Sequence, residues 1–351
     1  MRVLSGPLPP ALRNTILSEY NRLTGERIAV QDFRRLTEQS PAGPALHALL
    51  ETNGGRVAAH CCLLPFALKG PGGSMVVAKE HYFFLSEEYR SQAVREFERS
   101  RKPAAALLLA KLYEAAFQKS WLPILACAPP QLEPIHDYAG CRSVDFSVRD
   151  CYFILHPGRA WQGAHHLRQR TRASFVAASL WNRAYASCLS PWQYRSGLVR
   201  QSRIADDTIS TNGHSSRRFS LPEDPAFLRW RYPDSSYVRL AVNDGTSAYV
   251  IAAKGSPYTY ARVCQFRAPS LAAIPSLMEK LIREARASDA VGVRWSIWGD
   301  GPEQNQLVSE LRKRTFLCVH RVRRLLLSSS DPQFASADAW NLSDSLFTFD
   351  L

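Results

Sequence analysis

The chain has no apolar run that approaches the length of about 18 residues needed for a membrane-spanning helix, so none is expected. None of its eight cysteines forms a C-x-x-C pair, and without clustered ligands at short spacing we expect no metal site. Most cysteines lie in apolar, strand-like runs, which predicts buried, reduced thiols. The first residues, MRVLSGPLPPALRN, lack the apolar segment of a signal peptide. These absences favour a cytoplasmic protein.

The composition is that of a folded protein with a strong positive charge. Hydrophobic residues make up 46% of the chain and charged residues 21%, which is ordinary for a chain with an apolar core. The 351 residues suffice for two domains of usual size. The net charge is +13, and such an excess favours anionic partners such as nucleic acid, a phosphorylated cofactor, an acidic carrier protein or a membrane surface.

Residues 74–144 show an order of elements around which the chain is organised. An apolar strand, a charged loop, an apolar helix, a short strand, a second helix and a further strand follow one another. Before them, helical spacing predicts two helices, and Asn53-Gly54-Gly55 predicts a hairpin. The expected helices are 8–23, 30–38, 103–118 and 131–140, and the expected strands include 75–85, 122–127 and a strand or pair of strands from Cys141.

A weaker copy of the same order lies near residues 258–327 and predicts a repeat of one domain type. Helices are expected at 270–286 and 303–313, with strands between and around them. Basic and then polar residues at 157–223 predict a helical linker with a mobile loop around 205–218. The expected organisation is therefore a domain at 1–156, the linker at 157–223, a domain at 224–330 and a polar, aromatic tail at 331–351.

Three short motifs carry a resemblance to a known superfold. FLSEEYRS (84–91), AFLRWRYPDSSY (226–237) and WNLSDSLFTFDL (340–351) are similar to segments of tandem GNAT acyltransferases from bacterial polysaccharide, lipid or secondary-metabolite gene clusters. The chain also resembles, more distantly, Fem-type aminoacyl transferases and N-acyl amino acid synthases. The resemblance covers most of the chain outside 157–223. It implies an α+β protein with two GNAT-like domains, each a mixed, largely antiparallel sheet flanked by helices.

The chain departs from this superfold at the loop that would hold the donor's phosphates. Active GNAT domains use a glycine-rich loop, because backbone N–H groups must approach the pyrophosphate closely. Here the corresponding segments are RSQAVREFERSRKPA and FRAPS, which contain no glycine. We expect cations before the helix and the first helical residues to bind the donor instead, or else to be solvated loop charges. The expected donor-binding residues are Arg90, Arg99, Arg101, Lys102, Ala104 and Ala105.

Two pairs of residues are candidates for acid–base chemistry. Glu80 and His81 interrupt the apolar run MVVAKEHYFFL, where an ionisable group is unfavourable unless it is used or paired. We expect Glu80 to be a base or a substrate ligand, the alternative being an edge position that faces solvent. The resemblance implies a general acid in the segment HDYAGC, at either His136 or Tyr138. Cys127 is expected to be a buried structural cysteine.

Aromatic residues of the second half are candidates for a substrate pocket. Trp295 and Trp298 are expected to point to one face of the strand WSIWG, where Trp230 and Tyr232 would join them. Asp300, at the end of that strand, is a candidate polar contact. The alternative is an ordinary aromatic core.

The resemblance implies transfer of an acyl group from a thioester to an amine. The expected donor is acyl-CoA or the phosphopantetheine thioester of an acyl carrier protein, and the expected acceptor is a small metabolite, an amino acid or a sugar. No metal is expected. Two alternatives stay open: a Fem-type transferase that uses aminoacyl-tRNA, and a degenerate GNAT protein that binds ligands without catalysis.

Overall fold

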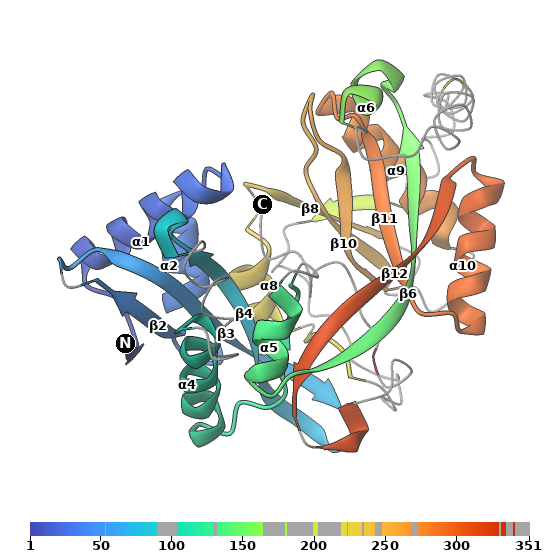
Figure 1. Cartoon of the computed structure of the whole chain (residues 1–351). Coiled ribbons are helices and arrows are strands. Elements are labelled where there is room, and N and C mark those ends of the chain that lie inside the picture. The colour runs from blue at the N-terminus through green and yellow to red at the C-terminus, as the bar shows by residue number, and fades with distance from the viewer. Residues whose placement is uncertain are drawn as a thin grey trace. The chain divides into compact units, whose positions relative to one another are not determined.

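The computed structural model describes most of the chain, and it divides the chain into two compact units (Figure 1). Unit 1 comprises Met1–Asp145, Ser215–Pro222 and Arg324–Trp340, and unit 2 comprises Phe146–His214, Glu223–Arg323 and Asn341–Leu351. The described residues are 1–52, 54–89, 104–128, 132–163, 180, 199–202, 219–222, 224–233, 235–242, 248–267, 273–329, 331–334 and 340.

Unit 1 is a mixed sheet with helices on both faces. Its strand order is β1-β2-β3-β4-β5-β12; β4 and β5 are parallel, and the other neighbouring strands of this order are antiparallel. The elements are β1 (Arg2–Ser5), α1 (Pro10–Thr24), α2 (Val30–Glu38), β2 (Leu46–Glu51), β3 (Val57–Gly70), β4 (Gly73–Leu85), α4 (Ala104–Gln118), β5 (Ile124–Ala126), α5 (Glu133–Tyr138) and the carboxyl-terminal part of β12 (Leu317–Ser328). Helix α4 makes the crossover that parallel strands require.

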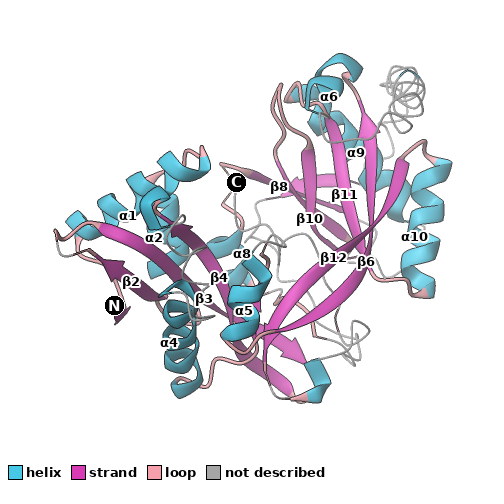
Figure 2. Ribbon diagram, in the orientation of Figure 1, coloured by secondary structure: helices cyan, strands magenta, loops and turns pink. Residues whose placement is uncertain are grey.

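Alternation along the strands of unit 1 separates its two faces. Leu46, Ala48 and Cys61 belong to the core that the buried side of α4 covers. Between them in sequence, His47 and His60 face the opposite side, where Phe33 of α2 packs near His47. Figure 2 shows α1 and α2 on one side of β2, β3 and β4 and α4 on the other.

Unit 2 is also a mixed sheet flanked by helices. Its strand order is β6-β11-β10-β9-β8-β7; β10 and β11 are parallel, and the other neighbouring strands of this order are antiparallel. The elements are β6 (Arg142–Ile154), α6 (Pro157–Gly163), β7 (Val199–Ser202), α8 (Pro225–Arg231), β8 (Tyr237–Val242), β9 (Tyr249–Ala253), β10 (Ala261–Arg267), α9 (Ile274–Ala287), β11 (Gly292–Trp298) and α10 (Pro302–Lys313). The expected fold class, two mixed sheets flanked by helices, is confirmed.

Each sheet takes its final strand from the other half of the sequence. Strand β12 follows α10, yet its Leu326 pairs with Ala126 of β5 and belongs to the core of unit 1. Strand β6 follows α5, yet its Phe153 pairs with Val293 of β11 and belongs to the core of unit 2. Both strands therefore begin in one unit and end in the other.

Several sequence expectations need correction. Cys151 and Cys318 form a disulfide rather than reduced thiols, because β6 and β12 bring residues 167 apart in sequence to a Cα–Cα distance of 4.0 Å. Cys127 is exposed, because it lies just beyond the end of β5. A strand, β7, lies in the segment expected to be a helical linker, since pairing with β8 outweighs its weak local pattern. The expected loop around 205–218 lies outside the described residues.

The domain boundaries derived from the sequence stay predictions, since much of 157–223 is outside the described part of the chain. No helix in that described part has the length and apolar character needed to cross a bilayer. The described residues also contain no group of three or more His, Cys, Asp or Glu side chains suited to a metal ion.

Candidate functional site

Glu80 lies where the parallel strands β4 and β5 stop running together. The β4–β5 ladder pairs Ala78 with Ile124 and Lys79 with Leu125, and Glu80 is the next residue along β4. Strand β5 ends at Ala126, while β4 continues to Leu85. The carboxyl ends of adjacent parallel strands are the place where α/β sheets commonly bind ligands. On its other side β4 pairs with β3, so Glu80 is not at a solvent-facing edge, and that alternative is wrong.

Glu80 joins Tyr113 and His136 in a buried polar cluster. The Tyr113 hydroxyl donates to Glu80 Oε2 over 2.8 Å, and His136 Nε2 lies 3.1 Å from both Glu80 carboxylate oxygens. The side chain of Glu80 is 8% exposed and that of His136 is 0% exposed. An ionised carboxylate at this depth needs such partners, because burial without them is strongly unfavourable.

The hydrogen bonds of His136 favour its protonated form. Its Nδ1 lies 2.9 Å from the backbone carbonyl of Leu132, which can only accept a hydrogen bond. Its Nε2 faces the carboxylate of Glu80, which is also an acceptor when ionised. Only the imidazolium carries an N–H at both ring positions, so the two acceptors together select a protonated His136 beside an ionised Glu80.

The electrostatics of the pair agree with this assignment. Burial by itself would raise the pKa of Glu80, but the charge of His136 and the hydrogen bonds from His136 and Tyr113 outweigh it and lower the pKa. Burial would likewise lower the pKa of His136, but the charge and hydrogen bond of Glu80 raise it. Burial, followed by the Glu80 charge, raises the pKa of Tyr113, so this phenol stays a donor.

The crossover helix explains how the three side chains meet. Helix α4 connects β4 to β5 and packs Tyr113 beneath the sheet, and α5 follows β5 with His136 on its buried side. The sequence analysis did not select Tyr113. The available signal was a hydroxyl on the core-facing side of an apolar helix, since a buried tyrosine hydroxyl usually has a polar partner.

Strand β4 is distorted two residues beyond Glu80. Cys62 pairs with His81 and His60 pairs with Phe84, so the register shifts between these pairs. Tyr82, between them, has φ of 50°, in the left-handed region that non-glycine residues rarely adopt. The ring of His60 donates from Nδ1 to the Tyr82 carbonyl over 2.9 Å and so holds this irregular backbone in place. Such bulges often re-aim residues next to a functional site.

The other predicted catalytic and donor-binding residues do not belong to this cluster, and some of them lie outside the residues that the structure describes. His81 is buried, with its ring 4.0 Å from the ring of Tyr82. Tyr138 ends α5 and is 40% exposed. Ala104 begins α4, and Ala105 is buried in the core of unit 1. The predicted cationic residues Arg90, Arg99, Arg101 and Lys102 lie outside the described residues.

The predicted aromatic pocket is not assembled as expected. Trp295 and Trp298 are three residues apart on β11, and a strand's period of two places them on opposite faces, so the expectation of one face is wrong. Trp295 packs against Phe266, and Trp298 packs against Phe146.

The remaining substrate candidates have partners of their own. Trp230 and Tyr232 are buried and both pack against Phe227. Asp300 forms an ion pair with Arg149 at 2.8 Å and is half exposed. The substrate-binding roles of these residues stay predictions.

Comparison with known proteins shows the fold. No family model and no curated protein matches the sequence. Solved structures do match: a GCN5-related N-acetyltransferase from Kribbella flavida (15% identity, TM-score 0.55, covering 93% of this chain and 70% of that one) and another from Anabaena variabilis (12%, 0.53, 93% and 72%). An N-myristoyltransferase from Saccharomyces cerevisiae, solved with myristoyl-CoA and inhibitors, also matches (9%, 0.57, 97% and 86%). The chain therefore has the GNAT fold.

Proposed function

We propose that this protein is an acyltransferase that moves an acyl group from a thioester to the amine of a small molecule. The observation that carries the proposal is the buried Glu80–His136 pair at the place where β4 and β5 separate. Acyl transfer to an amine needs one group that accepts the amine proton and one that protonates the leaving thiolate. The pair offers both, since one member is an ionised carboxylate and the other a protonated imidazole.

The proposed step balances in atoms and charge. The amine nitrogen attacks the thioester carbonyl, a C–N bond forms, and the C–S bond breaks. Glu80 accepts the proton that the amine loses, and His136 donates its Nε2 proton to the thiolate. The proton on Glu80 then crosses the 3.1 Å contact to His136, which restores the starting pair. Tyr113 keeps its hydrogen bond to Glu80 and holds the carboxylate in position.

We propose acyl-CoA as the donor. The yeast N-myristoyltransferase that shares the fold was solved with myristoyl-CoA. Helix α4 begins at Ala104, close in sequence to the cations predicted to bind the donor, and a helix N-terminus attracts anionic groups. An acyl carrier protein and aminoacyl-tRNA are the competing donors, and each is a separate arm of the test.

The test measures release of free thiol from acyl-CoAs of increasing chain length with a panel of amines, amino acids and amino sugars. We expect Glu80→Gln and His136→Gln to lower kcat/KM by about 10²–10⁴-fold, the usual contribution of acid–base groups. Glu114→Gln and Lys111→Gln are matched controls, because both side chains are exposed on α4, the helix that carries Tyr113. They should retain wild-type activity, and near-UV circular dichroism should show that all four variants are folded.

Three outcomes would change the assignment. Full activity in folded Glu80→Gln and His136→Gln would remove the proposed site while keeping the reaction. Product formed only with acyl carrier protein or aminoacyl-tRNA would replace the donor. Tight acyl-CoA binding without thiol release, for every acceptor tested, would favour a non-catalytic binding protein.

A further inference from the structure

A second polar cluster, in unit 2, is built around the buried carboxylate of Asp150. Asp150 lies on β6 and is 0% exposed. It accepts a hydrogen bond from Ser296 Oγ over 2.6 Å. Three guanidinium groups also face it: Arg294 Nη2 at 3.2 Å, Arg321 Nε at 3.3 Å and Arg323 Nη2 at 3.4 Å. One carboxylate therefore contacts three guanidinium groups, whereas an ordinary ion pair consists of one anion and one cation.

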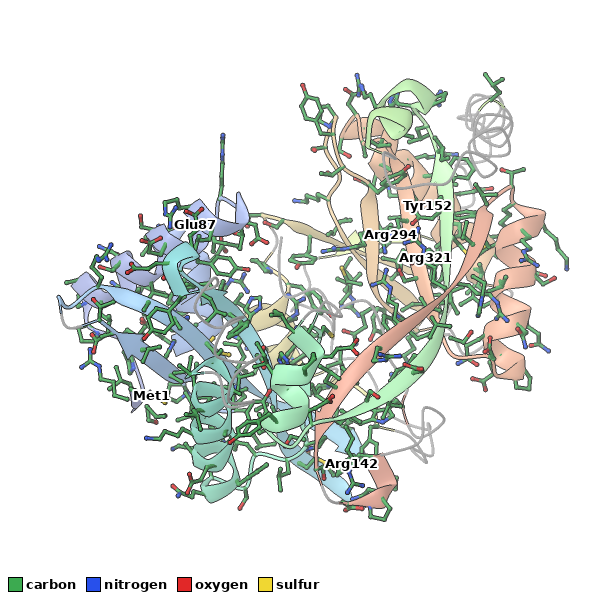
Figure 3. The ribbon with its side chains drawn as sticks, viewed as in Figure 1. Met1, Glu87, Arg142, Tyr152, Arg294 and Arg321 are labelled. Atoms are coloured by element: carbon green, nitrogen blue, oxygen red, sulfur yellow. A yellow bond between two sulfur atoms is a disulfide. The ribbon has the colours of Figure 1, made fainter. Side chains whose placement is uncertain are left out.

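Strand register places these residues on a single face of the sheet. Asp150 pairs with Ser296 and Tyr152 pairs with Arg294, so these four side chains share a face. Arg321 and Arg323 are two residues apart on β12 and also share a face. Figure 3 shows Tyr152, Arg294 and Arg321 on three neighbouring strands of unit 2.

The opposite face of β11 is occupied by the core. Val293, Trp295 and Ile297 point into it, together with residues of α9 and α10. The arginine cluster therefore lies on the sheet face away from these two helices.

The cations reach solvent, although the carboxylate beneath them does not. The exposed fractions of the side chains are 25% for Arg294, 44% for Arg321 and 28% for Arg323. Among the described residues of this cluster the formal charge is three positive groups against one negative group. Like charges held this close repel one another, so the arrangement is stabilised when a further anion binds.

The carboxylate of Asp150 and two aromatic rings hold the guanidinium groups in place. Arg294 lies over the ring of Tyr152 at 5.9 Å, and Arg323 lies over the ring of Trp298 at 5.5 Å. Arg321 contacts Asp150 through Nε, and the Arg321 side chain is 44% exposed. Restraint of this kind lowers the entropy lost when a ligand orders the donors.

We propose that Arg294, Arg321 and Arg323 form a binding site for the phosphate group of a phosphorylated small molecule. A phosphate monoester carries close to two negative charges on one group, which matches the excess of two positive charges among the described residues of the cluster. Its three terminal oxygens accept several N–H donors at once, and planar guanidinium groups suit them geometrically. A single carboxylate would neutralise only half of this excess. The site does not depend on the chemistry proposed for Glu80 and His136.

The test measures the binding of inorganic phosphate by calorimetry and by its effect on the melting temperature. Both measurements are made at about pH 8, and sodium chloride keeps the ionic strength constant. We expect phosphate to bind the wild-type protein and raise its melting temperature. Arg321→Gln and Arg323→Gln should each weaken phosphate binding about tenfold or more, since each removes a charge-assisted contact. Arg321→Lys keeps the charge without the planar fork and should give an intermediate loss. Arg312→Gln, on the exposed side of α10, is the matched control and should bind phosphate as the wild type does.

The outcomes separate this site from general charge effects. Equal phosphate binding by the wild type and by both glutamine variants would overturn the proposal, and so would a stabilisation that chloride matches. Succinate is the second probe, and succinate binding without phosphate binding would also overturn it. A cooperative melting transition in sodium chloride alone shows that a variant is folded. Arg321→Gln should disturb the core least, because the Arg321 side chain is the most exposed of the three arginines.

Discussion

At the scale of single residues, the Glu80–His136 pair makes stability depend on pH from two sides. The pKa of Glu80 is lowered from 4.5, so its contribution is complete above that value and is lost as pH falls through the lower, folded pKa. The pKa of His136 is raised from 6.5, so its contribution is complete below that value and is lost as pH rises through the higher, folded pKa. The pair therefore stabilises most between pH 4.5 and 6.5.

This argument predicts a pH-dependent effect of His136→Gln on the free energy of unfolding. Removing one partner of a buried pair costs about 3–5 kcal/mol. We expect a loss of that size between the two limits, and a smaller loss at more acidic and more alkaline pH. Denaturant unfolding of wild type and variant across a pH series gives the difference directly. A difference that does not change with pH would contradict the assigned ionisation states.

The residues of the site differ in how far the sequence could predict them. Glu80 could be predicted, because an acidic residue inside an apolar strand has a limited choice of environments. His136 followed from the resemblance of its segment to a known pattern. Tyr113 could not be predicted, because a tyrosine on the apolar side of a helix is explained by core packing alone. Its role became evident only from its hydrogen bond to Glu80. Asp150 and Arg321 are 171 residues apart, and only tertiary structure brings them together.

At the scale of elements, the contact between β11 and β6 rests on a glycine. Gly292 begins β11, opposite Ile154 of β6, and a Cβ atom there would lie 2.0 Å from the carbonyl oxygen of Phe153. That atom belongs to the backbone and cannot turn aside. We predict that Gly292→Ala forces the two strands apart and destabilises unit 2 by about 1–3 kcal/mol, the usual cost of an overpacked site.

A matched glycine tests whether the effect is local. Gly158 lies in α6, also in unit 2, and an added Cβ would meet no atom within 4 Å. Gly158→Ala should therefore be neutral or slightly stabilising, since alanine favours a helix by about 1 kcal/mol over glycine. Denaturant unfolding compares the two variants. Equal stabilities for both would show that the β6–β11 contact can relax to admit a side chain.

Local sequence patterns predicted most helices and strands, but they failed for strands that form only because a neighbouring strand offers backbone hydrogen bonds. The helix expected at 30–38 matches α2 from end to end, and the strand expected at 75–85 ends with β4 at Leu85, since their patterns are strong. Strands β1 and β7, of four residues each, were missed because so short a segment has too little pattern to distinguish it. They are strands because β2 and β8 offer them backbone partners.

At the scale of the whole molecule, the sequence suggested the repeated order of elements but not the exchange of final strands. The order could be predicted because each element follows from its own residues. The exchange could not, because β6 and β12 are both alternating strands, and either could complete either sheet by pattern alone. The partners of β5 and β11 are fixed by register: Leu326 pairs with Ala126, and Cys151 pairs with Trp295.

The exchange predicts that the two halves of the chain fold only together. A fragment of residues 1–156 lacks the carboxyl-terminal part of β12 and the buried Phe219 and Trp340, all of which belong to unit 1. The fragment of residues 157–351 lacks β6, whose Phe153 belongs to the core of unit 2. Each fragment alone would leave a strand edge unpaired and apolar surface exposed, so neither should show a cooperative thermal transition.

Mixing the two fragments should restore folding, because each supplies the strand that the other lacks. Near-UV circular dichroism and gel filtration, with reductant present to keep Cys151 and Cys318 as thiols, would follow the recovery. A control fragment of residues 157–316 omits β12 but keeps β11, α9 and α10. Mixed with residues 1–156, it should fail to restore unit 1, since β5 would again lack its antiparallel neighbour. A cooperative transition in residues 1–156 alone, at the midpoint of the full-length protein, would mean that unit 1 is stable without the exchanged strand.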